Sequence, residues 1–189
     1  MDIQAVAILG SHRAKSNTEV LLNYLVESLQ DKGVECLIFK LRELDVIPCK
    51  SCRRCLSSKW CVIDDDLTNK VFPNLVETDI IIIATPTYFD NVSTLTKIFM
   101  DRTWSLRGLL RNKVLGAVVV GRGYGLDTAL NAIHNWALKH RMIIGDRGVT
   151  GRGFEYCEVI NDVSAIKACE EHANRLRELA EIIKRHKIK

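Results

Sequence analysis

The sequence of 189 residues has no apolar run long enough to cross a bilayer, which takes about 20 residues in a helix. Its apolar stretches, such as residues 80–84 and 117–120, have the length of β-strands. The first residues, Met1-Asp2-Ile3-Gln4, lack the basic start and the long apolar segment of a secretory signal. We therefore expect a cytoplasmic protein that does not associate with membranes.

An excess of charge of one sign is also missing. The chain has 27 Lys and Arg against 23 Asp and Glu, a net charge of +4. Part of this excess lies in the basic tail, residues 184–189, which is typical of a solvated helix end. A nucleic-acid-binding surface needs a stronger basic face. We predict no nucleic-acid partner.

Several catalytic patterns are absent. The five histidines form neither a Ser/His/Asp nor an H-E-x-x-H arrangement, and the glycines match neither the nucleotide triphosphatase loop nor G-x-G-x-x-G. His134 is expected on the solvated side of its helix, whereas His12 lies inside a loop that could bind phosphate. The run Asp64-Asp65-Asp66 fits either a hard cation or an acidic helix start.

Short apolar runs alternate with helical patterns along the whole chain. Strands are predicted at residues 5–9, 35–40, 79–85, 113–120 and 142–145, and helices at 18–32, 66–77, 93–106, 126–139 and 160–184. Pro73 weakens the second of these helices. Strands that are apolar on both faces and separated by helices predict one α/β domain over residues 1–189, with five parallel strands in a three-layer sandwich. Such sheets bind ligands beyond the carboxyl ends of their strands.

The loop after the first predicted strand, residues 10–18, suits an anion. Ser16, Asn17 or Thr18 could cap the following helix, whose free N–H groups attract negative charge. Arg13 adds a planar set of donors that fits phosphate. An ordinary capped helix with solvated charges is the alternative.

Two further loops follow buried strands. Residues 85–93 carry Pro86, Tyr88 and Phe89, which could hold a flat heterocycle, although Phe89 could instead pack as a hydrophobic staple. Residues 121–125 contain three glycines, which allow a ligand to approach the backbone closely and which also suit a plain turn. Three such loops at successive strand ends favour a ligand site more than any one of them.

The spacing Cys49-x2-Cys52-x2-Cys55-x5-Cys61 is the strongest signal in the chain, within the irregular segment 41–63. Thiolates at two successive two-residue gaps favour a [4Fe–4S] cluster over zinc, which usually takes two separated pairs. A reactive loop without metal is the remaining alternative. Neighbouring cations would lower the thiol pKa values and offset the charge of a cluster; they are Lys50, Arg53, Arg54 and Lys59. Cys169 is expected in the core, and Cys36 and Cys157 lack ligand-like neighbours.

Four segments together resemble the iron–sulfur flavoproteins, a family of flavodoxin-like FMN reductases. They are GSHRAKSNT, PCKSCRRCLSSKWCVIDDD, TPTYFDNVSTLTKIFMDR and VVVGRGYG, and the resemblance covers about residues 5–153. It implies a flavodoxin-like sheet of order 2-1-3-4-5, bound FMN, a [4Fe–4S] cluster, and oligomers with flavin sites near subunit contacts.

The resemblance also assigns residues. For the FMN phosphate it implies Ser11, Arg13, Ser16, Asn17 and Thr18. Around the flavin ring it implies Pro86, Thr87, Tyr88, Phe89 and Asn91, and in the third flavin loop Gly121 and Gly123. The cluster ligands would be Cys49, Cys52, Cys55 and Cys61. This chain departs from the family in having His12 where proline is common, and Arg122 and Tyr124 where small residues are common.

The sequence thus predicts an FMN-dependent oxidoreductase that transfers electrons between a [4Fe–4S] cluster and FMN, with no catalytic side chain required. The expected partners are a second copy of the chain, as dimer or tetramer, and an electron donor such as ferredoxin or NAD(P)H. One alternative is an NAD(P)H-dependent FMN or quinone reductase without a functional cluster. Another is a zinc-stabilised binding module without redox activity.

Overall fold

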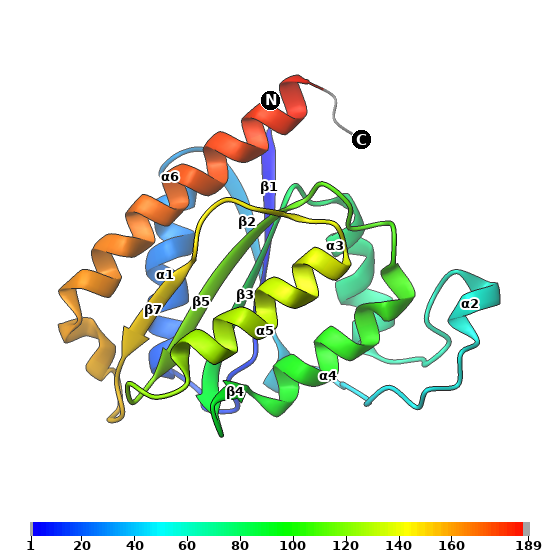
Figure 1. The fold of residues 1–189 in the computed structure, drawn as a ribbon, viewed down its shortest axis with the longest axis horizontal. Coiled ribbons are helices and arrows are strands. Elements are labelled where there is room, and N and C mark those ends of the chain that lie inside the picture. The colour runs from blue at the N-terminus through cyan, green and yellow to red at the C-terminus, as the bar shows by residue number, and fades with distance from the viewer. Residues whose placement is uncertain (1, 187–189) are drawn as a thin grey trace.

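The computed structural model describes residues 2–186 and shows a twisted sheet between two layers of helices (Figure 1). The main strands are parallel in the order β2-β1-β3-β5-β6. Their bounds are Ile3–Leu9 for β1, Val34–Lys40 for β2, Ile80–Tyr88 for β3, Val114–Gly121 for β5 and Ile143–Ile144 for β6.

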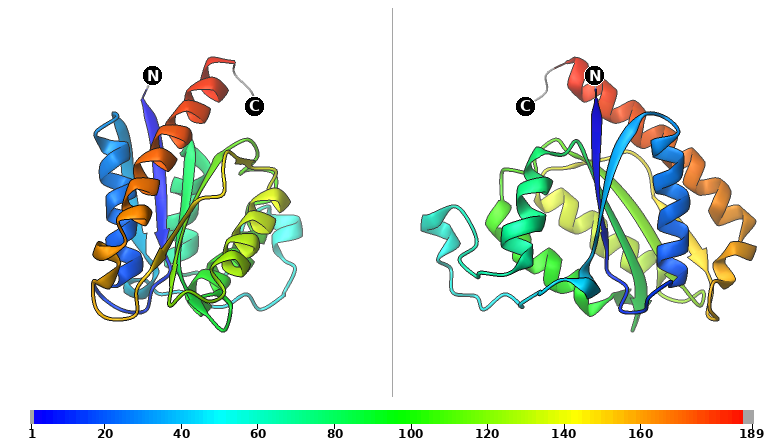
Figure 2. Two further views of the ribbon diagram at one scale, coloured as in Figure 1. Left: turned by 60° about the vertical axis from the view of Figure 1, so that its left-hand side comes forward. Right: turned by 180° about the vertical axis from the view of Figure 1, so that it is seen from behind.

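Helices cover both faces of the sheet (Figure 2). One face carries α1 (Asn17–Gln30) and α6 (Val163–Arg185), and the other carries α3 (Phe72–Glu77), α4 (Thr94–Arg102) and α5 (Leu126–Lys139). Successive strand residues point to opposite faces. In β1, Ala5 and Ala7 therefore join the core under α1 and α6, while Val6 and Ile8 join the opposite core. This alternation explains why the strands are apolar throughout.

The predicted order of the five main strands is confirmed, because counting β5 as the fourth and β6 as the fifth gives 2-1-3-4-5. The predicted count is too low, since the described residues form seven strands. The extra strands are β4 (Asn91–Val92), which folds back antiparallel on β3, and β7 (Val149–Arg152), which pairs with β5 beyond β6. Neither was predicted from the sequence, because β4 is two residues long and β7 contains a glycine.

A buried histidine fills the gap between β6 and β7. The first pairs with Val114 and Leu115 and the second with residues 118–121, so Ala117 lacks a strand partner on this side. The N–H of Ala117 donates to Nε2 of His172 from α6 (3.2 Å), and Nδ1 of His172 lies 2.8 Å from the Asp146 carboxylate. The side chain of His172 thus replaces the backbone acceptor that a neighbouring strand would provide for Ala117.

The predicted helices differ from the observed ones mainly at their ends. The segment predicted at 66–77 begins as a π-turn, η2 (Leu67–Val71), and continues as α3. Pro73 lies in the first turn of α3, where a missing N–H costs no hydrogen bond. After α4, the chain continues as the 3₁₀ turn η3 (Thr103–Leu106), and η4 (Glu158–Asn161) precedes α6.

The segment predicted to be irregular, residues 41–63, contains two short turns. These are the 3₁₀ turn η1 (Leu41–Glu43) and the one-turn helix α2 (Cys55–Ser58). The segment extends away from the sheet on the side of α4 (Figure 1). None of the helices within residues 2–186 is both long and apolar enough to span a membrane.

Candidate functional site

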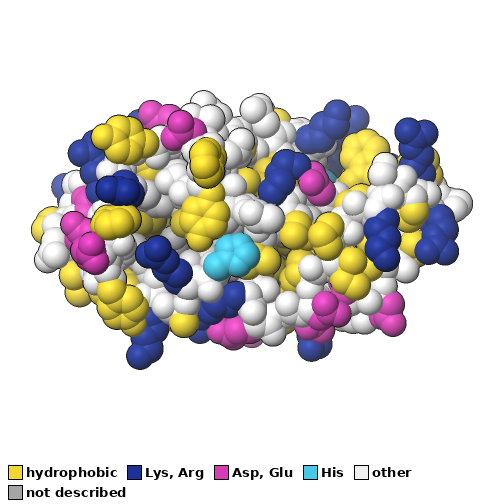
Figure 3. Space-filling model, turned by 90° about the horizontal axis from the view of Figure 1, so that it is seen from below, with side chains coloured by type: hydrophobic (Ala, Val, Ile, Leu, Met, Phe, Trp, Pro, Cys, Tyr) yellow, Lys and Arg dark blue, Asp and Glu magenta, His cyan; other side chains and the backbone are white. Residues whose placement is uncertain are grey.

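Four loops meet at the carboxyl ends of the strands and enclose a pocket of about 690 Å³. Figure 3 looks onto this end of the molecule, where hydrophobic and basic side chains surround a histidine. Ten of the twelve residues predicted to bind the flavin line the pocket. They are Ser11, Arg13, Ser16, Asn17, Thr18, Pro86, Thr87, Tyr88, Phe89 and Gly121.

The other two predicted residues lie outside this lining. Asn91 belongs to β4 and pairs with Tyr88, so it stabilises the loop through strand pairing. Gly123 lines a neighbouring cavity of about 940 Å³ between the first turns of α5 and α6. Both lie in or beside loops that form the pocket, but the conformation of each loop decides which residues line it.

The loop before α1 is organised as an anion site. Ser16 caps the helix by accepting the N–H of Glu19 (3.2 Å), and Ser11 Oγ accepts the N–H of Arg13 (3.3 Å). The N–H groups of Asn17 and Thr18 precede the first intrahelical bond, so they are available to a ligand at the positive end of the helix dipole. Arg13 is exposed at the pocket.

Glu19, which sequence reasoning missed, braces this loop. Its carboxylate is nearly buried, accepts the N–H of Lys15 (2.9 Å) and pairs with Lys40 (2.8 Å) and Arg42 (3.2 Å). Burial alone would raise the pKa of Glu19, but Lys40 and Arg42 lower it overall. The carboxylate therefore stays charged and fixes the loop to β2.

Buried hydroxyl groups join the loop before α1 to residues 85–93, at the end of β3 and after it. Ser93 Oγ donates to the carbonyl of Gly10 (2.5 Å), and Thr85 Oγ1 accepts the N–H of Ser93 (3.0 Å). A Cβ at Gly10 would clash with Thr96 Oγ1 in the first turn of α4, so a side chain there would push the loop before α1 away from α4. The close approach of this loop to α4 therefore requires Gly10.

Phe89 does not pack as a staple. Its side chain is fully exposed, and both Phe89 (φ 47°) and Asp90 (φ 56°) adopt the left-handed conformation. The hydrophobic staple considered for Phe89 is therefore wrong. Such strain in consecutive non-glycine residues is typical of functional loops.

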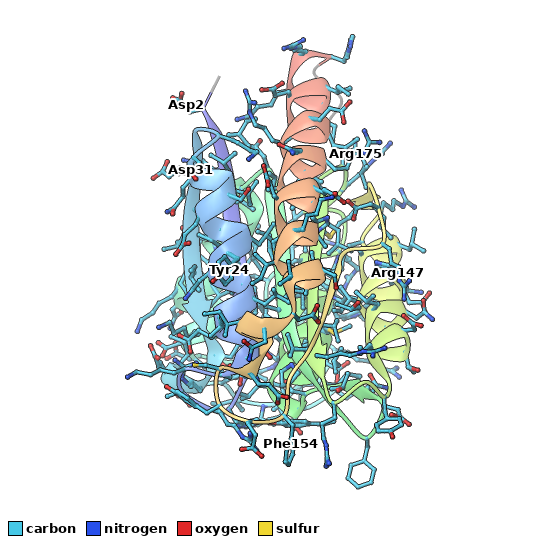
Figure 4. All side chains as sticks on the ribbon, turned by 90° about the vertical axis from the view of Figure 1, so that its left-hand side faces the viewer. Asp2, Tyr24, Asp31, Arg147, Phe154 and Arg175 are labelled. Carbon is cyan, nitrogen blue, oxygen red and sulfur yellow. The ribbon has the colours of Figure 1, made fainter. Side chains whose placement is uncertain are left out.

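The fourth loop of the pocket, residues 153–156, was not predicted. Asn17 holds it by donating to the carbonyl of Glu155 (2.8 Å) and accepting the N–H of Val159 (3.2 Å). The Arg122 guanidinium lies 3.9 Å from the centre of the Phe154 ring. Figure 4 shows Phe154 at the lower end of the molecule, where the strands end. Two aromatics within three residues after Gly153 were the available signal in the sequence.

Aromatic side chains form a rim around the pocket. The rim consists of Tyr88, Phe89, Tyr124, Phe154 and Tyr156, all of them exposed. His12 stacks on Tyr88, with ring centres 6.2 Å apart and planes inclined by 12°. The departure from the family at His12 therefore extends the rim.

A third cavity, of about 540 Å³, is lined by all four clustered cysteines, and we call it the cysteine cavity. Cys49 and Cys52 are exposed, Cys55 and Cys61 are half-buried, and all four thiols are free. The backbone N–H of Arg54 and then its side chain lower the pKa of Cys52. Within residues 2–186, no three metal-ligating side chains are close enough together to hold a single ion. The thiols thus share a cavity without the geometry of a one-ion site.

A buried ion pair lies beside this cavity, with Arg102 in the lining. The Arg102 guanidinium and the Asp65 carboxylate are both buried, with Nη1–Oδ2 at 2.5 Å and Nη2–Oδ1 at 3.0 Å. Of the two alternatives that the sequence left open, the acidic helix start holds for Asp65, because it accepts the N–H of Thr68 in η2 (3.1 Å); its charge is paired with Arg102 and not with a hard cation. Burial lowers the pKa of Arg102, but Asp65 and then Cys61 raise it overall.

The chemistry of this cavity fits an iron–sulfur cluster. Four thiols, neighbouring cations and a buried arginine suit an anionic group rich in sulfur. Nε of Arg102 is buried and has no acceptor among the described residues. A cluster ligated at this position would bring sulfur acceptors close to that donor.

The remaining cysteines and His134 line neither the pocket at the strand ends nor the cysteine cavity. Cys169 is in the core, as predicted, and burial raises the pKa of its thiol to about 12. Burial also raises the pKa of Cys36, to about 11. His134 is half-buried, its Nε2 has no partner among the described residues, and burial lowers its pKa. The expected solvated position of His134 is therefore wrong.

Comparison with known proteins gives the same fold and a family. An iron–sulfur flavoprotein of Methanocaldococcus jannaschii is 34% identical over 194 residues, covering 97% of this chain and all of that protein. An iron–sulfur flavoprotein of Methanosarcina thermophila is 31% identical, covering 99% of this chain and all of the relative.

Solved structures support the fold at lower identity. RosB, solved with 8-demethyl-8-formylriboflavin-5'-phosphate, superposes with a TM-score of 0.83 at 16% identity, covering 97% of this chain and 81% of RosB. A flavodoxin of Streptococcus pneumonia superposes with a TM-score of 0.63 at 18% identity, covering 93% and 99%. The family profile of the NADPH-dependent FMN reductases matches residues 3–153. The chain therefore belongs to the NADPH-dependent FMN reductase family and, within it, to the iron–sulfur flavoproteins, and is an FMN-dependent oxidoreductase.

Proposed function

We propose that this protein transfers electrons between FMN in the pocket at the strand ends and a [4Fe–4S] cluster held by Cys49, Cys52, Cys55 and Cys61. The observation that carries the proposal is the cavity shared by these four cysteines. It lies at the C-terminal end of α4, while Ser93 at the other end of α4 contacts the loops of the larger pocket. The names of the curated relatives support the same pairing of cofactors.

In this proposal the chain binds and orients FMN. Arg13 and the N–H groups at the start of α1 hold the phosphate, while Pro86, Tyr88 and Gly121 lie against the ring. FMN supplies reversible redox chemistry when bound. Thr87 faces the same pocket, while Asn91 and Gly123 shape the adjoining turns.

The partners are also part of the proposal. The aromatic rim is an apolar surface at the mouth of the pocket, and such surfaces are typical of protein interfaces. We therefore include self-association through the rim, with electrons supplied by a donor such as ferredoxin or NAD(P)H. A flat cofactor edge at this rim would be accessible to either donor.

The test is an anaerobic purification followed by an absorption spectrum, with iron and acid-labile sulfide counted on the same sample. We expect flavin bands on a broad cluster absorbance and about four irons per chain, as a cubane requires. Cys55→Ser should lose iron and sulfide while keeping flavin. Cys157→Ser is the matched control, because this partly exposed cysteine lies outside the cysteine cavity.

Other results would replace the proposal. Flavin without iron or sulfide would leave an NAD(P)H-dependent FMN or quinone reductase with four unused cysteines. Tightly bound zinc in place of iron, without yellow colour, would contradict both cofactor assignments.

A further inference from the structure

Arg102 connects the two ends of the cysteine loop, residues 48–62. Its Nη1 donates to the carbonyl of Ile47 (2.5 Å), immediately before the loop, and its Nη2 lies 3.5 Å from the carbonyl of Ile63, immediately after it. One side chain from α4 therefore contacts both stems of the cysteine loop: the first stem, at Ile47, precedes the loop, and the second, residues 63–65, follows it. The guanidinium is 1% exposed, so water does not compete for these bonds.

Asp65, in the second stem, adds further hydrogen bonds to this arrangement, which we call the clamp. Its Oδ2 accepts the N–H of Ile47 (3.0 Å), and its Oδ1 accepts the N–H of Thr68 (3.1 Å). Thr68 Oγ1 in turn accepts from Nη2 of Arg102 (2.8 Å). The hydrogen bonds of Arg102, Asp65 and Thr68 thus hold the two stems at a fixed distance from each other.

One donor of Arg102 remains unused. A guanidinium has five N–H donors. The four on Nη1 and Nη2 face the acceptors already named, whereas the buried Nε–H has no acceptor among residues 2–186. A buried donor without a partner destabilises the folded protein, because it has lost its hydrogen bond to water. Such a cost calls for an acceptor that arrives with a ligand.

Cys61 is the sulfur placed to supply that acceptor. It lines the same cavity as Arg102, and it lies two residues before Ile63, whose carbonyl is 3.5 Å from Nη2 of Arg102. A thiolate that ligates iron is a better acceptor than a free thiol, because it carries negative charge. The unused N–H and the ligand sulfur therefore match in position and in charge.

We propose that Arg102 is a positioning residue for the cluster: it clamps both stems of the cysteine loop and donates its Nε–H to the sulfur of Cys61. This inference rests on the proposed function, because it assumes a cluster at the four cysteines. Hydrogen bonds to ligand sulfurs and nearby positive charge stabilise the reduced cluster, so they raise its reduction potential.

The test compares Arg102→Lys with Asp65→Asn in anaerobically purified holoprotein. Lysine keeps the positive charge but lacks Nε–H, whereas Asp65→Asn leaves Nε–H in place and weakens the clamp. We expect Arg102→Lys to shift the reduction equilibrium of the cluster about tenfold toward the oxidised form, about 59 mV for one electron. Asp65→Asn keeps Nε–H and removes a negative charge, so the potential should not fall below that of the wild type. Arg107→Lys is the matched control, because Arg107 is partly exposed and packs on Trp104 instead.

A second measurement tests the clamp in protein freed of iron. Hydrogen exchange at the amides of Ile47 and Thr68 should accelerate at least tenfold in both Arg102→Lys and Asp65→Asn. The amide of Ile82 in the middle of β3 should be unchanged. Should Arg102→Lys fail to fold, the double variant Arg102→Gln with Asp65→Asn replaces the ion pair by neutral groups, and the same loss of potential is expected.

The outcomes separate this inference from the proposed function. A wild-type protein that binds neither iron nor sulfide contradicts the proposed function, and the exchange measurement still decides the clamp. A cluster of unchanged potential in Arg102→Lys overturns the Nε–H bond while leaving the proposed function intact. Unchanged exchange at Ile47 overturns the clamp.

Discussion

His140 shows how one buried residue responds to its surroundings. Thr103 Oγ1 donates to the carbonyl of Met100 (2.7 Å) and accepts from Trp136 Nε1 (2.8 Å), so its contact with His140 Nε2 (3.1 Å) requires a proton on Nε2. Nδ1 is then the bare nitrogen, and it is buried without a partner among the described residues. Burial lowers the pKa of His140 to about 4, because a second proton would bring an unpaired charge inside.

This lowered pKa predicts acid sensitivity. An unfolded histidine titrates near pH 6.5, whereas folded His140 titrates near 4, so between these values the unfolded chain binds a proton that the folded chain does not. The free energy of unfolding should therefore fall from pH 6.5 toward 4, by about 3 kcal/mol from this residue. Urea unfolding at several pH values measures it. His140→Gln removes the titrating group, so its curve should be flatter, and equal slopes would contradict the prediction.

At the scale of whole elements, α4 connects the two cavities. Ser93 begins it beside the loops of the flavin-sized pocket, and Arg102 ends it beneath the cysteines. Nine residues of α-helix are about 14 Å long, so the two helix ends that border the cavities lie about that far apart. The helix is fixed at both ends by buried hydrogen bonds. It therefore sets the spacing between the proposed cofactors.

The start of α1 gives a prediction for the loop before it. Arg13 and Lys15 are both exposed cations in this loop, but Arg13 lines the pocket and Lys15 does not. Arg13→Ala should weaken FMN binding about 10-fold to 100-fold, because a hydrogen bond to a charged group contributes about 1.5–3 kcal/mol. Lys15→Ala should change it less than about threefold, within the range of exposed charges. Flavin fluorescence titration measures both, and equal affinities would contradict the phosphate-loop assignment.

Five exposed aromatic side chains gather at one end of the molecule. The exposed aromatics of the rim surround the pocket mouth, while the cysteine loop lies to the other side of α4 (Figure 1, Figure 3). A ligand pocket ringed by exposed aromatics suits a protein that places its cofactor near a partner surface. Self-association through the rim can therefore be tested by measuring the size of the assembly in solution.

Removal of rim aromatics should weaken that assembly. Sedimentation velocity of the wild type should show a dimer or tetramer, and Phe89→Ser combined with Tyr124→Ser should shift it toward monomer, because both side chains are largely exposed. Leu138→Ser is the control, since Leu138 is an exposed apolar residue near the other end of α5. A monomeric wild type, or a variant that assembles like it, would contradict self-association through the rim.

Much of the fold and of the candidate site followed from the sequence alone. Strands that are apolar on both faces require cover on both sides, so the three-layer sandwich and the meeting of three loops were predictable. The four cysteines were predictable as a group because their spacing is local. Pro73 was overrated as a helix breaker, because a π-turn places it in the first turn of α3.

Only the tertiary structure decided the rest, because those features join residues distant in the chain. The fourth loop reaches the pocket through Asn17, far away in sequence, and His172 completes the sheet beside Ala117. Asp65 and Arg102 each resemble an ordinary surface charge in the sequence. Their burial as a pair depends on how α4 packs against the stems of the cysteine loop, and sequence patterns carry periodicity and spacing but no information on such packing.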